Sequence, residues 1–166
     1  MPLSLNEIRE RKIEERDNFA LATLIRSTLK EFGANHPGTV YFDTTTDILF
    51  QQFQHTPRSV YYVAEQEDEI VGGGGIFPSN DLPGDTCELV KMYLYPQVRG
   101  IGLGKLLIQK CIQFAKEAGY QNIYLETMPE LQLALKTYEK FGFEYINAPM
   151  GNTGHFGCDL WMLKKI

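Results

Sequence analysis

The chain has 166 residues, the size of one domain, and 43% of them are hydrophobic and 12% aromatic. This composition excludes a disordered protein, and no apolar run approaches the roughly 18–20 residues that span a bilayer. The 16 basic and 21 acidic residues give a net charge of −5, which argues against nucleic acid as a partner. We expect a single domain over residues 1–166 that binds neither nucleic acid nor a membrane.

The first half of the chain predicts one strand, two helices and then an antiparallel meander. The first helix has apolar residues at helical spacing and Asp17 as its N-cap, and a loop rich in glycine and proline follows it at residues 33–38. The meander is indicated by three runs with strand character that short polar stretches separate. The expected ranges are 8–13 for the first strand, 17–31 and 44–53 for the helices, and 59–66, 70–77 and 86–95 for the meander.

The second half predicts a helix, a strand, a further helix and a closing hairpin. The last meander strand, the helix and the next strand form a strand–helix–strand unit, which implies a parallel crossover. The expected ranges are 102–118 and 129–141 for the helices, and 122–127, 143–146 and 159–165 for the strands. We therefore expect an α+β fold with one central mixed, mostly antiparallel sheet flanked by about four helices.

The sharpest local signal is the turn Arg99-Gly100-Ile101-Gly102-Leu103-Gly104-Lys105, between a predicted strand and a predicted helix. Its spacing fails the dinucleotide fingerprint G-x-G-x-x-G and the P-loop G-x-x-x-x-G-K-[ST]. It fits the pattern [Q/R]-x-x-G-x-[G/A] at Arg99, Gly102 and Gly104. Glycines let backbone N–H groups converge on an anion at the positive end of a helix, so the turn predicts a phosphate or pyrophosphate site. The alternative is a tight connection without a ligand.

Residues 88–143 resemble the GNAT superfamily of acetyl-CoA-dependent N-acetyltransferases. The resemblance rests on the strand E-L-V-K-M-Y-L-Y-P, the loop V-R-G-I-G-L-G-K-L-L, the strand Y-L-E-T and the helix end Y-E-K-F-G-F. The segments C-E-L-x-K-M-Y and T-G-H-F-G-C look more narrowly like a poorly characterised bacterial subgroup. Many relatives have asparagine seven residues before the tyrosine of Y-E-K-x-G-F, but here Leu131 takes that place, so no polar cofactor contact is expected from it.

The resemblance implies a GNAT-like fold and acetyl-CoA as the donor. It implies that the turn from Arg99 to Lys105 cradles the pyrophosphate and that the splayed strand ending in Met92, Tyr93 and Leu94 pairs with the pantetheine arm. The implied cofactor-binding residues are Met92, Tyr93, Leu94, Arg99, Gly100, Ile101, Gly102, Leu103, Gly104 and Lys105.

Acetyl transfer to an amine needs a base, donors for the oxyanion and an acid for the departing thiolate. The resemblance makes Tyr138 the candidate acid, while helical spacing alone favours a core residue. Glu88 is the candidate base, directly or through water; the alternative is a solvated or ion-paired glutamate beside Lys91. We expect Met92 to supply a backbone N–H to the oxyanion, and Glu88, four residues earlier, to project from the same strand face.

Three further features bear on the acceptor. His155, near Cys158 and Asp159, has too few ligands around it for a structural metal, so we expect no metal and assign it to substrate contact or to a structural role. Tyr41 lies in a loop that we expect to line the acceptor pocket. The glycines at 72–75 leave room for the acceptor beside the sheet, or allow tight packing against the first helix.

We therefore predict an N-acetyltransferase that uses acetyl-CoA and a small amine, such as an amino acid or an amine metabolite. A non-catalytic acyl-CoA-binding module and a protein N-acetyltransferase are the alternatives, and a homodimer is left open. Residues 1–16 are highly charged and show no secretory signal, and the three cysteines are widely spaced. Both features favour reduced thiols and a cytoplasmic location.

Overall fold

The computed structural model describes residues 2–166, and within them seven strands form one sheet in the order β1-β2-β3-β4-β5-β7-β6. Neighbouring strands are antiparallel except β4 and β5, which run parallel. This arrangement confirms the mixed, mostly antiparallel sheet and the parallel crossover. The strands are β1 (Arg9–Lys12), β2 (Val60–Gln66), β3 (Glu69–Phe77), β4 (Thr86–Leu94), β5 (Asn122–Thr127), β6 (Glu144–Ile146) and β7 (Leu160–Lys165).

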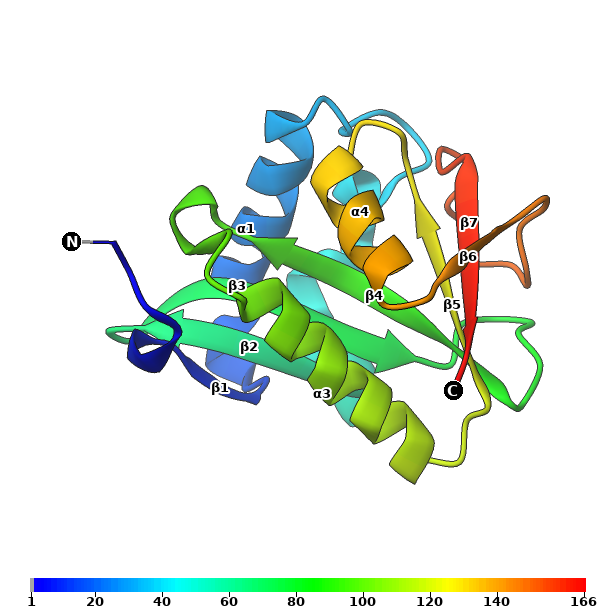
Figure 1. Ribbon diagram of the computed structural model, residues 1–166, viewed down its shortest axis with the longest axis horizontal. Helices are drawn as coiled ribbons and strands as arrows, with labels where there is room; N and C mark the ends of the chain where they lie inside the picture. The colour runs from blue at the N-terminus through cyan, green and yellow to red at the C-terminus, as the bar shows by residue number, and fades with distance from the viewer. Residues whose placement is uncertain (1) are drawn as a thin grey trace.

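Four α-helices flank the sheet, as expected, with α3 and α4 in front of it and α1 and α2 behind it in Figure 1. The second expected helix begins with a 3-10 segment, Thr44–Ile48, before its α-helical turns. Among residues 2–166, no helix combines the length and the apolar character that crossing a membrane requires. The helices are α1 (Asn18–Glu31), α2 (Leu49–Gln54), α3 (Leu103–Glu117) and α4 (Gln132–Lys140).

Asp17 stands at the N-cap of α1, as predicted, but its carboxylate does not cap the helix. It accepts hydrogen bonds from both terminal nitrogens of Arg11, at 2.8 and 2.9 Å, and from the backbone N–H of Glu14 at 2.7 Å. The guanidinium of Arg11 also binds Glu65 on β2. This network ties the start of α1 to the edge of the sheet.

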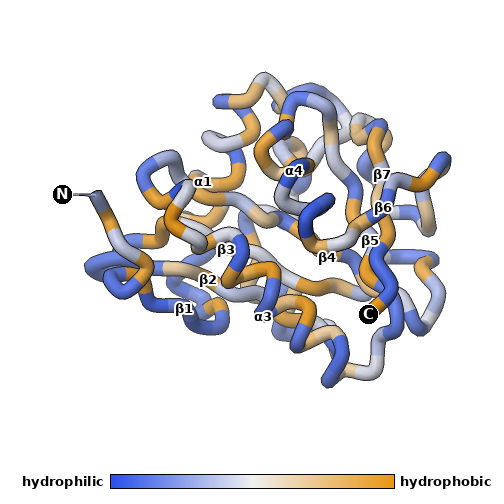
Figure 2. The backbone as a smooth tube through the Cα atoms, in the orientation of Figure 1, coloured by the Kyte–Doolittle hydropathy of each residue, from blue (hydrophilic) through white to orange (hydrophobic). Residues whose placement is uncertain are grey.

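The hydrophobic core lies in two layers, one on each face of the sheet. The apolar stripe of α3, including Ile108 and Cys111, packs against the strands in front. The stripe of α1, including Leu24 and Ile25, packs against Tyr61 and its neighbours behind. Figure 2 shows these hydrophobic stretches in the strands and along the helices, with hydrophilic stretches in the outer turns.

Strands β4 and β5 pair over a short distance and then separate. Their register runs only from Thr86 opposite Asn122 to Glu88 opposite Tyr124. The two strands diverge beyond this point (Figure 1), so the second half of β4 has no strand partner on that side. The separation opens the sheet next to Glu88.

A bulge in β4 lies just beyond the separation. Val90 is opposite Gly75 and Tyr93 is opposite Gly73, so Lys91 and Met92 together face the single residue Gly74. A bulge of this kind bends the strand and removes backbone groups from the regular ladder. The backbone of Lys91 has φ +50°, the left-handed conformation that residues other than glycine rarely adopt.

Side chains of the neighbouring strands, Tyr61 above all, explain the glycine run opposite this bulge. A Cβ at Gly73 would lie 2.8 Å from the ring of Tyr61, and one at Gly75 would lie 2.7 Å from it. The ring therefore occupies the space that side chains would take, and its hydroxyl donates a 2.7 Å hydrogen bond to the carbonyl of Lys91. A Cβ at Gly72 would collide with the side chain of Leu94, and one at Gly74 with that of Met92. Tight packing against side chains of the two neighbouring strands therefore explains the run.

The bulge also corrects the expectation that Glu88 and Met92 share a strand face. A one-residue insertion reverses the alternation of side chains along a strand. Met92 accordingly packs with the α3 side of the core, whereas Glu88 faces the opposite side, near α2.

Candidate active site

The turn before α3 has an open backbone at its glycines. Gly100 and Gly102 have φ of +77° and +94°, and a Cβ built on either would meet no atom within 4 Å. The space in front of the helix N-terminus is therefore free for a ligand, and glycine meets the conformational demand. Leu103 is fully buried and anchors the helix, while Lys105 is exposed. The turn therefore leaves room for an anionic group at the N-terminus of α3.

The side chain of Arg99 turns away from this open space. Its guanidinium donates hydrogen bonds of 2.9 and 2.7 Å to the carboxylate of Glu31 and bonds of 3.1 and 2.9 Å to the carbonyl of Leu94. Arg99 thus connects the turn to α1 and to the end of β4. Met92 and Leu94 pack toward α3, and Tyr93 packs toward α1.

Glu88 is a buried carboxylate on β4, at the last position that pairs with β5. The hydroxyl of Ser79 donates a hydrogen bond to its Oε1. Burial, reinforced by the nearby carboxylate of Glu126, raises the pKa of Glu88 to about 7, although Ser79, His155 and Lys91 each act to lower it. Because an effective general base has a pKa near the working pH, Glu88 suits proton removal from an amine.

His155 is held between two carboxylates. Its Nε2 lies 2.7 Å from Oδ2 of Asp43 and its Nδ1 lies 3.6 Å from Oε1 of Glu126. Burial alone lowers the pKa of His155, but its interactions with Asp43 and Glu126 prevail and raise it to about 9. The imidazole is therefore a cation at neutral pH, and it joins the 151–158 loop to the loop that carries Asp43.

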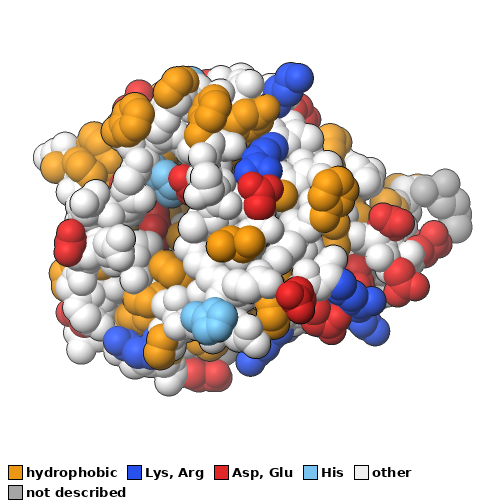
Figure 3. All heavy atoms as spheres, turned by 180° about the vertical axis from the view of Figure 1, so that it is seen from behind, with side chains coloured by type: hydrophobic (Ala, Val, Ile, Leu, Met, Phe, Trp, Pro, Cys, Tyr) orange, Lys and Arg blue, Asp and Glu red, His pale blue; other side chains and the backbone are white. Residues whose placement is uncertain are grey.

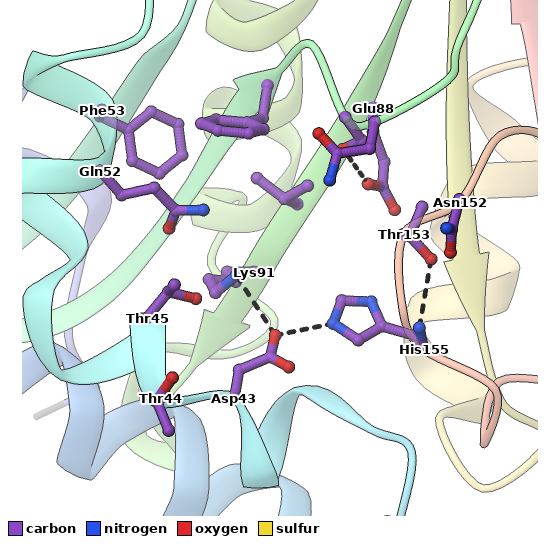
Figure 4. A pocket seen from close by; sticks show the side chains of 14 residues that line it. Asp43, Thr44, Thr45, Gln52, Phe53, Glu88, Lys91, Asn152, Thr153 and His155 are labelled. Carbon is purple, nitrogen blue, oxygen red and sulfur yellow. Dashed lines mark hydrogen bonds and ion pairs between the residues drawn. The ribbon is translucent and has the colours of Figure 1, made fainter.

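A cavity of about 280 Å³ lies between these loops, α2 and β4. Figure 4 shows the cavity from close by, and Figure 3 shows the back of the molecule, which is hollowed beside a histidine and an acidic side chain. The prediction that Tyr41 lines the acceptor pocket is wrong, because its ring packs against Phe42 with 5.1 Å between centroids. Asp43, two residues later in the same loop, lines the cavity instead. The lining residues with central roles below are Asp43, Gln52, Phe53, Glu88, Lys91 and His155.

Glu88, Glu126 and His155 each offer an atom within 4.8 Å of the others, so they form the group in residues 2–166 that best resembles a metal site. Every member already has protein partners. Ser79 donates to Glu88, Tyr124 and Thr153 donate to Glu126, and His155 bridges Asp43 and Glu126. The cluster is thus a satisfied hydrogen-bond network, and the expectation of no metal stays a prediction.

Tyr138 lies on α4, on the side of the sheet that α3 covers. Its ring packs against Phe143 with 5.8 Å between centroids, and its neighbours belong to the front core. Burial raises the pKa of Tyr138 above its ordinary value, so its hydroxyl stays protonated. The pKa of Tyr93, which packs on the α1 side of the sheet, is raised mainly by burial and secondarily by Tyr138.

Sequence reasoning missed Glu126 and the cavity-facing role of Lys91. Glu126 follows Tyr124 by two residues on β5, and Tyr124 pairs with Glu88. The parallel crossover predicted from the sequence could have brought these two carboxylates together. The position of Lys91 depends on the bulge, which no local pattern signals.

Comparison with known proteins agrees with this architecture. The model of the acetyltransferase (GNAT) family matches residues 23–143. The uncharacterized N-acetyltransferase YjgM of Escherichia coli (strain K12) is 40% identical over 94% of this chain and 93% of its own. A GNAT-family acetyltransferase from Staphylococcus aureus Mu50 superposes with a TM-score of 0.80 at 21% identity, over 95% of this chain and 98% of its own.

The PaiA N-acetyltransferase of Thermoplasma acidophilum, solved in complex with coenzyme A, superposes with a TM-score of 0.74 at 20% identity, over 96% of this chain and 99% of its own. These structures confirm the expected fold, and the match of the family model extends over most of the chain. The protein is therefore a member of the GNAT family of acetyltransferases.

Proposed function

We propose that this protein transfers the acetyl group of acetyl-CoA to the amine of a small molecule held in the cavity beside β4. The observation that carries the proposal is the position of Glu88. This carboxylate has a pKa of about 7, lines a cavity of about 280 Å³ and stands where β4 leaves β5. A base, an enclosed acceptor site and an opening in the sheet thus meet at one point.

The residues of the chain divide the work between the two sides of this opening. Glu88, behind the sheet, accepts the proton of the amine as its nitrogen forms the new bond to the acetyl carbon. Met92, in the bulge, directs a backbone N–H to the developing oxyanion. Tyr138, in front of the sheet, donates its hydroxyl proton to the sulfur as the carbon–sulfur bond breaks. Acetyl-CoA supplies the activated acetyl group, and Gly100 and Gly102 leave room for its pyrophosphate.

Release of the CoA thiol tests this proposal. The protein is incubated with acetyl-CoA and each member of a panel of amines and amino acids, and the acetylated product is identified by mass. We expect acceptor-dependent thiol release, and thermal stabilisation by acetyl-CoA but not by NAD or ATP. Binding of acetyl-CoA without turnover of any acceptor would favour a non-catalytic module, and turnover of peptides alone would favour a protein acetyltransferase.

A further inference from the structure

The side chain of Lys91 is buried, and its ammonium donates no hydrogen bond to any residue from 2 to 166. Its side chain is 6% exposed, and its Nζ lies 3.9 Å from Oδ2 of Asp43, which is beyond hydrogen-bond distance. Asp43 makes its short contact, 2.7 Å, with His155 instead. Nζ keeps some exposed surface and opens onto the cavity, and an ammonium has three N–H donors. The donors of Lys91 are therefore available to an anionic group in the cavity.

The bulge in β4 directs this cation into the cavity. In a regular strand, residues 88 and 91 would point to opposite faces. Because Lys91 and Met92 together oppose Gly74, Lys91 joins Glu88 and Val90 on the cavity wall. Figure 4 shows Lys91 and Glu88 along the same strand, with Asp43 and His155 facing them from the two loops. The site thus presents a base and a cation to the same small volume.

The two cations of the cavity, Lys91 and His155, differ in how many of their hydrogen-bond donors already have a partner. Nε2 of His155 hydrogen-bonds to Asp43 at 2.7 Å, and its Nδ1 forms a longer ion pair of 3.6 Å with Glu126. Lys91 has a single, longer ion pair, and burial lowers its pKa while Asp43 and Glu88 act to raise it. An additional carboxylate close to Nζ would favour the charged form of Lys91 and satisfy its donors.

The remaining walls indicate the size and polarity of the ligand. The volume of about 280 Å³ lies just under the roughly 300–1,000 Å³ of sites for drug-sized ligands, which suits one small molecule. Phe53 and Phe77 pack edge-to-face, with 5.2 Å between ring centroids, and form an apolar wall. Gln52 adds an amide whose buried Oε1 has no hydrogen-bond partner among residues 2–166. The cavity therefore offers surfaces for a charged, a polar and an apolar part of one ligand.

We propose that the acceptor is an amino acid whose carboxylate pairs with Nζ of Lys91 while its α-amino group, which gives up its ammonium proton to solvent before attack, lies toward Glu88. This assignment rests on the acetyltransferase function proposed above and narrows its acceptor class. An amino acid enters as a zwitterion with no net charge, and its carboxylate gives Nζ of Lys91 a partner that Asp43, bound to His155, supplies only at 3.9 Å. An apolar amino-acid side chain matches the wall of Phe53 and Phe77.

The experiment compares matched acceptors on the wild-type protein and on Lys91→Gln. The acceptors are phenylalanine, phenylalaninamide and phenethylamine, together with the corresponding leucine series, and kcat/KM is measured with saturating acetyl-CoA. A charge-assisted hydrogen bond predicts roughly a 10- to 100-fold preference of the wild type for the amino acid. In Lys91→Gln we expect this preference to fall to about one; because Lys91 also lowers the pKa of Glu88, the amine measured on the same variant is the reference for any general change in activity. Lys116→Gln, which removes an exposed lysine of α3, is the matched control and should keep the full preference.

Each outcome separates this inference from the proposed function. Acetylation of amines and amides as efficient as that of amino acids overturns the inference alone, and so does a preference that survives in Lys91→Gln. No thiol release with any acceptor overturns the proposed function and the inference together. Thermal melts and acetyl-CoA affinity establish that the variant is folded; if Lys91→Gln does not fold, Lys91→Asn replaces it, because asparagine tolerates positive φ. The wild-type comparison alone already decides whether the carboxylate is recognised.

Discussion

Replacing Glu88 with glutamine removes the proposed base with little change in shape. The amide cannot accept a proton from the amine, so we expect kcat/KM at pH 7.5 to fall by about 10²–10⁴. In the wild type, the carboxyl must lose its proton to act, so activity rises with pH to a midpoint near the Glu88 pKa of about 7. This limb of the pH profile should disappear in Glu88→Gln. Thiol release measured from pH 5.5 to 9 checks both effects.

The same substitution should stabilise the protein at alkaline pH. The folded pKa of Glu88 is about 7 against an ordinary value of 4.5, so the folded state holds this proton more tightly than the unfolded state. The proton on Glu88 stabilises the folded state by its full amount below about pH 4.5, and this stabilisation is lost as the pH rises through 7. The difference between the two pKa values corresponds to roughly 3 kcal/mol in the free energy of unfolding. The glutamine variant does not lose this stability, because glutamine carries no charge at any pH. Ser79 can still donate to the amide oxygen.

Thermal melts at pH 5 and pH 8 measure this effect. For a chain of this length, roughly 3 kcal/mol corresponds to about 6–12 °C in Tm. Glu88→Gln should therefore melt above the wild type at pH 8, by a margin that shrinks at pH 5, while the exposed control Glu130→Gln shows no such dependence. Normal activity with an intact acidic limb would refute the base assignment. An equal Tm difference at both pH values would refute the raised pKa.

Three other substitutions probe separate parts of the site. Tyr61→Phe keeps the ring but removes the hydrogen bond to the carbonyl of Lys91, so we expect about a 10-fold loss of kcat and a stability loss of about 1 kcal/mol. An unchanged kcat would show that this hydrogen bond at the bulge does not contribute to catalysis. Gly102→Asp places a charged side chain at positive φ before α3 and should weaken acetyl-CoA binding at least 10-fold by calorimetry, whereas Gly84→Asp, also in open space, should not. Tyr138→Phe should lower kcat by about 10²–10⁴ with a smaller change in KM for acetyl-CoA; kcat within about threefold of wild type would remove Tyr138 from the mechanism.

Most secondary structure could be predicted from the sequence because its signals are local. Apolar periodicity identified α1 and α3 to within a residue or two, and strand β2 began one residue later than expected. Helix α4 begins at Gln132, three residues later than expected, because residues 129–131 form a turn in which the Leu131 N–H bonds to the Met128 carbonyl. Turn geometry of this kind depends on the backbone path and leaves a weak trace in composition.

The site was predicted less completely because its parts meet only in three dimensions. The glycine turn carries a local signal because it lies between a strand and a helix, and Glu88 was proposed from its position on the strand that precedes this turn. Asp43 and His155 are 112 positions apart, and their contact arises when two glycine-containing loops pack together. The backbone N–H of Gly157 donates to the carbonyl of Gly38 in this packing, at 2.8 Å. No periodicity in either loop specifies that pairing.

The packing of Tyr61 connects the core of this fold to the proposed chemistry. Its ring fits only where Gly73 and Gly75 lack side chains, and its hydroxyl reaches the carbonyl of the left-handed residue Lys91. That contact stabilises a strained conformation, and the bulge in turn interrupts the regular ladder at Met92 and directs the ammonium of Lys91 toward the cavity. One buried hydrogen bond thus supports both the proposed oxyanion donor and the proposed carboxylate partner. Loss of the Tyr61 hydroxyl should accordingly weaken discrimination between amino acids and amines as well as kcat, whereas loss of the Lys91 ammonium should affect discrimination more than kcat, which it reaches only through the pKa of Glu88.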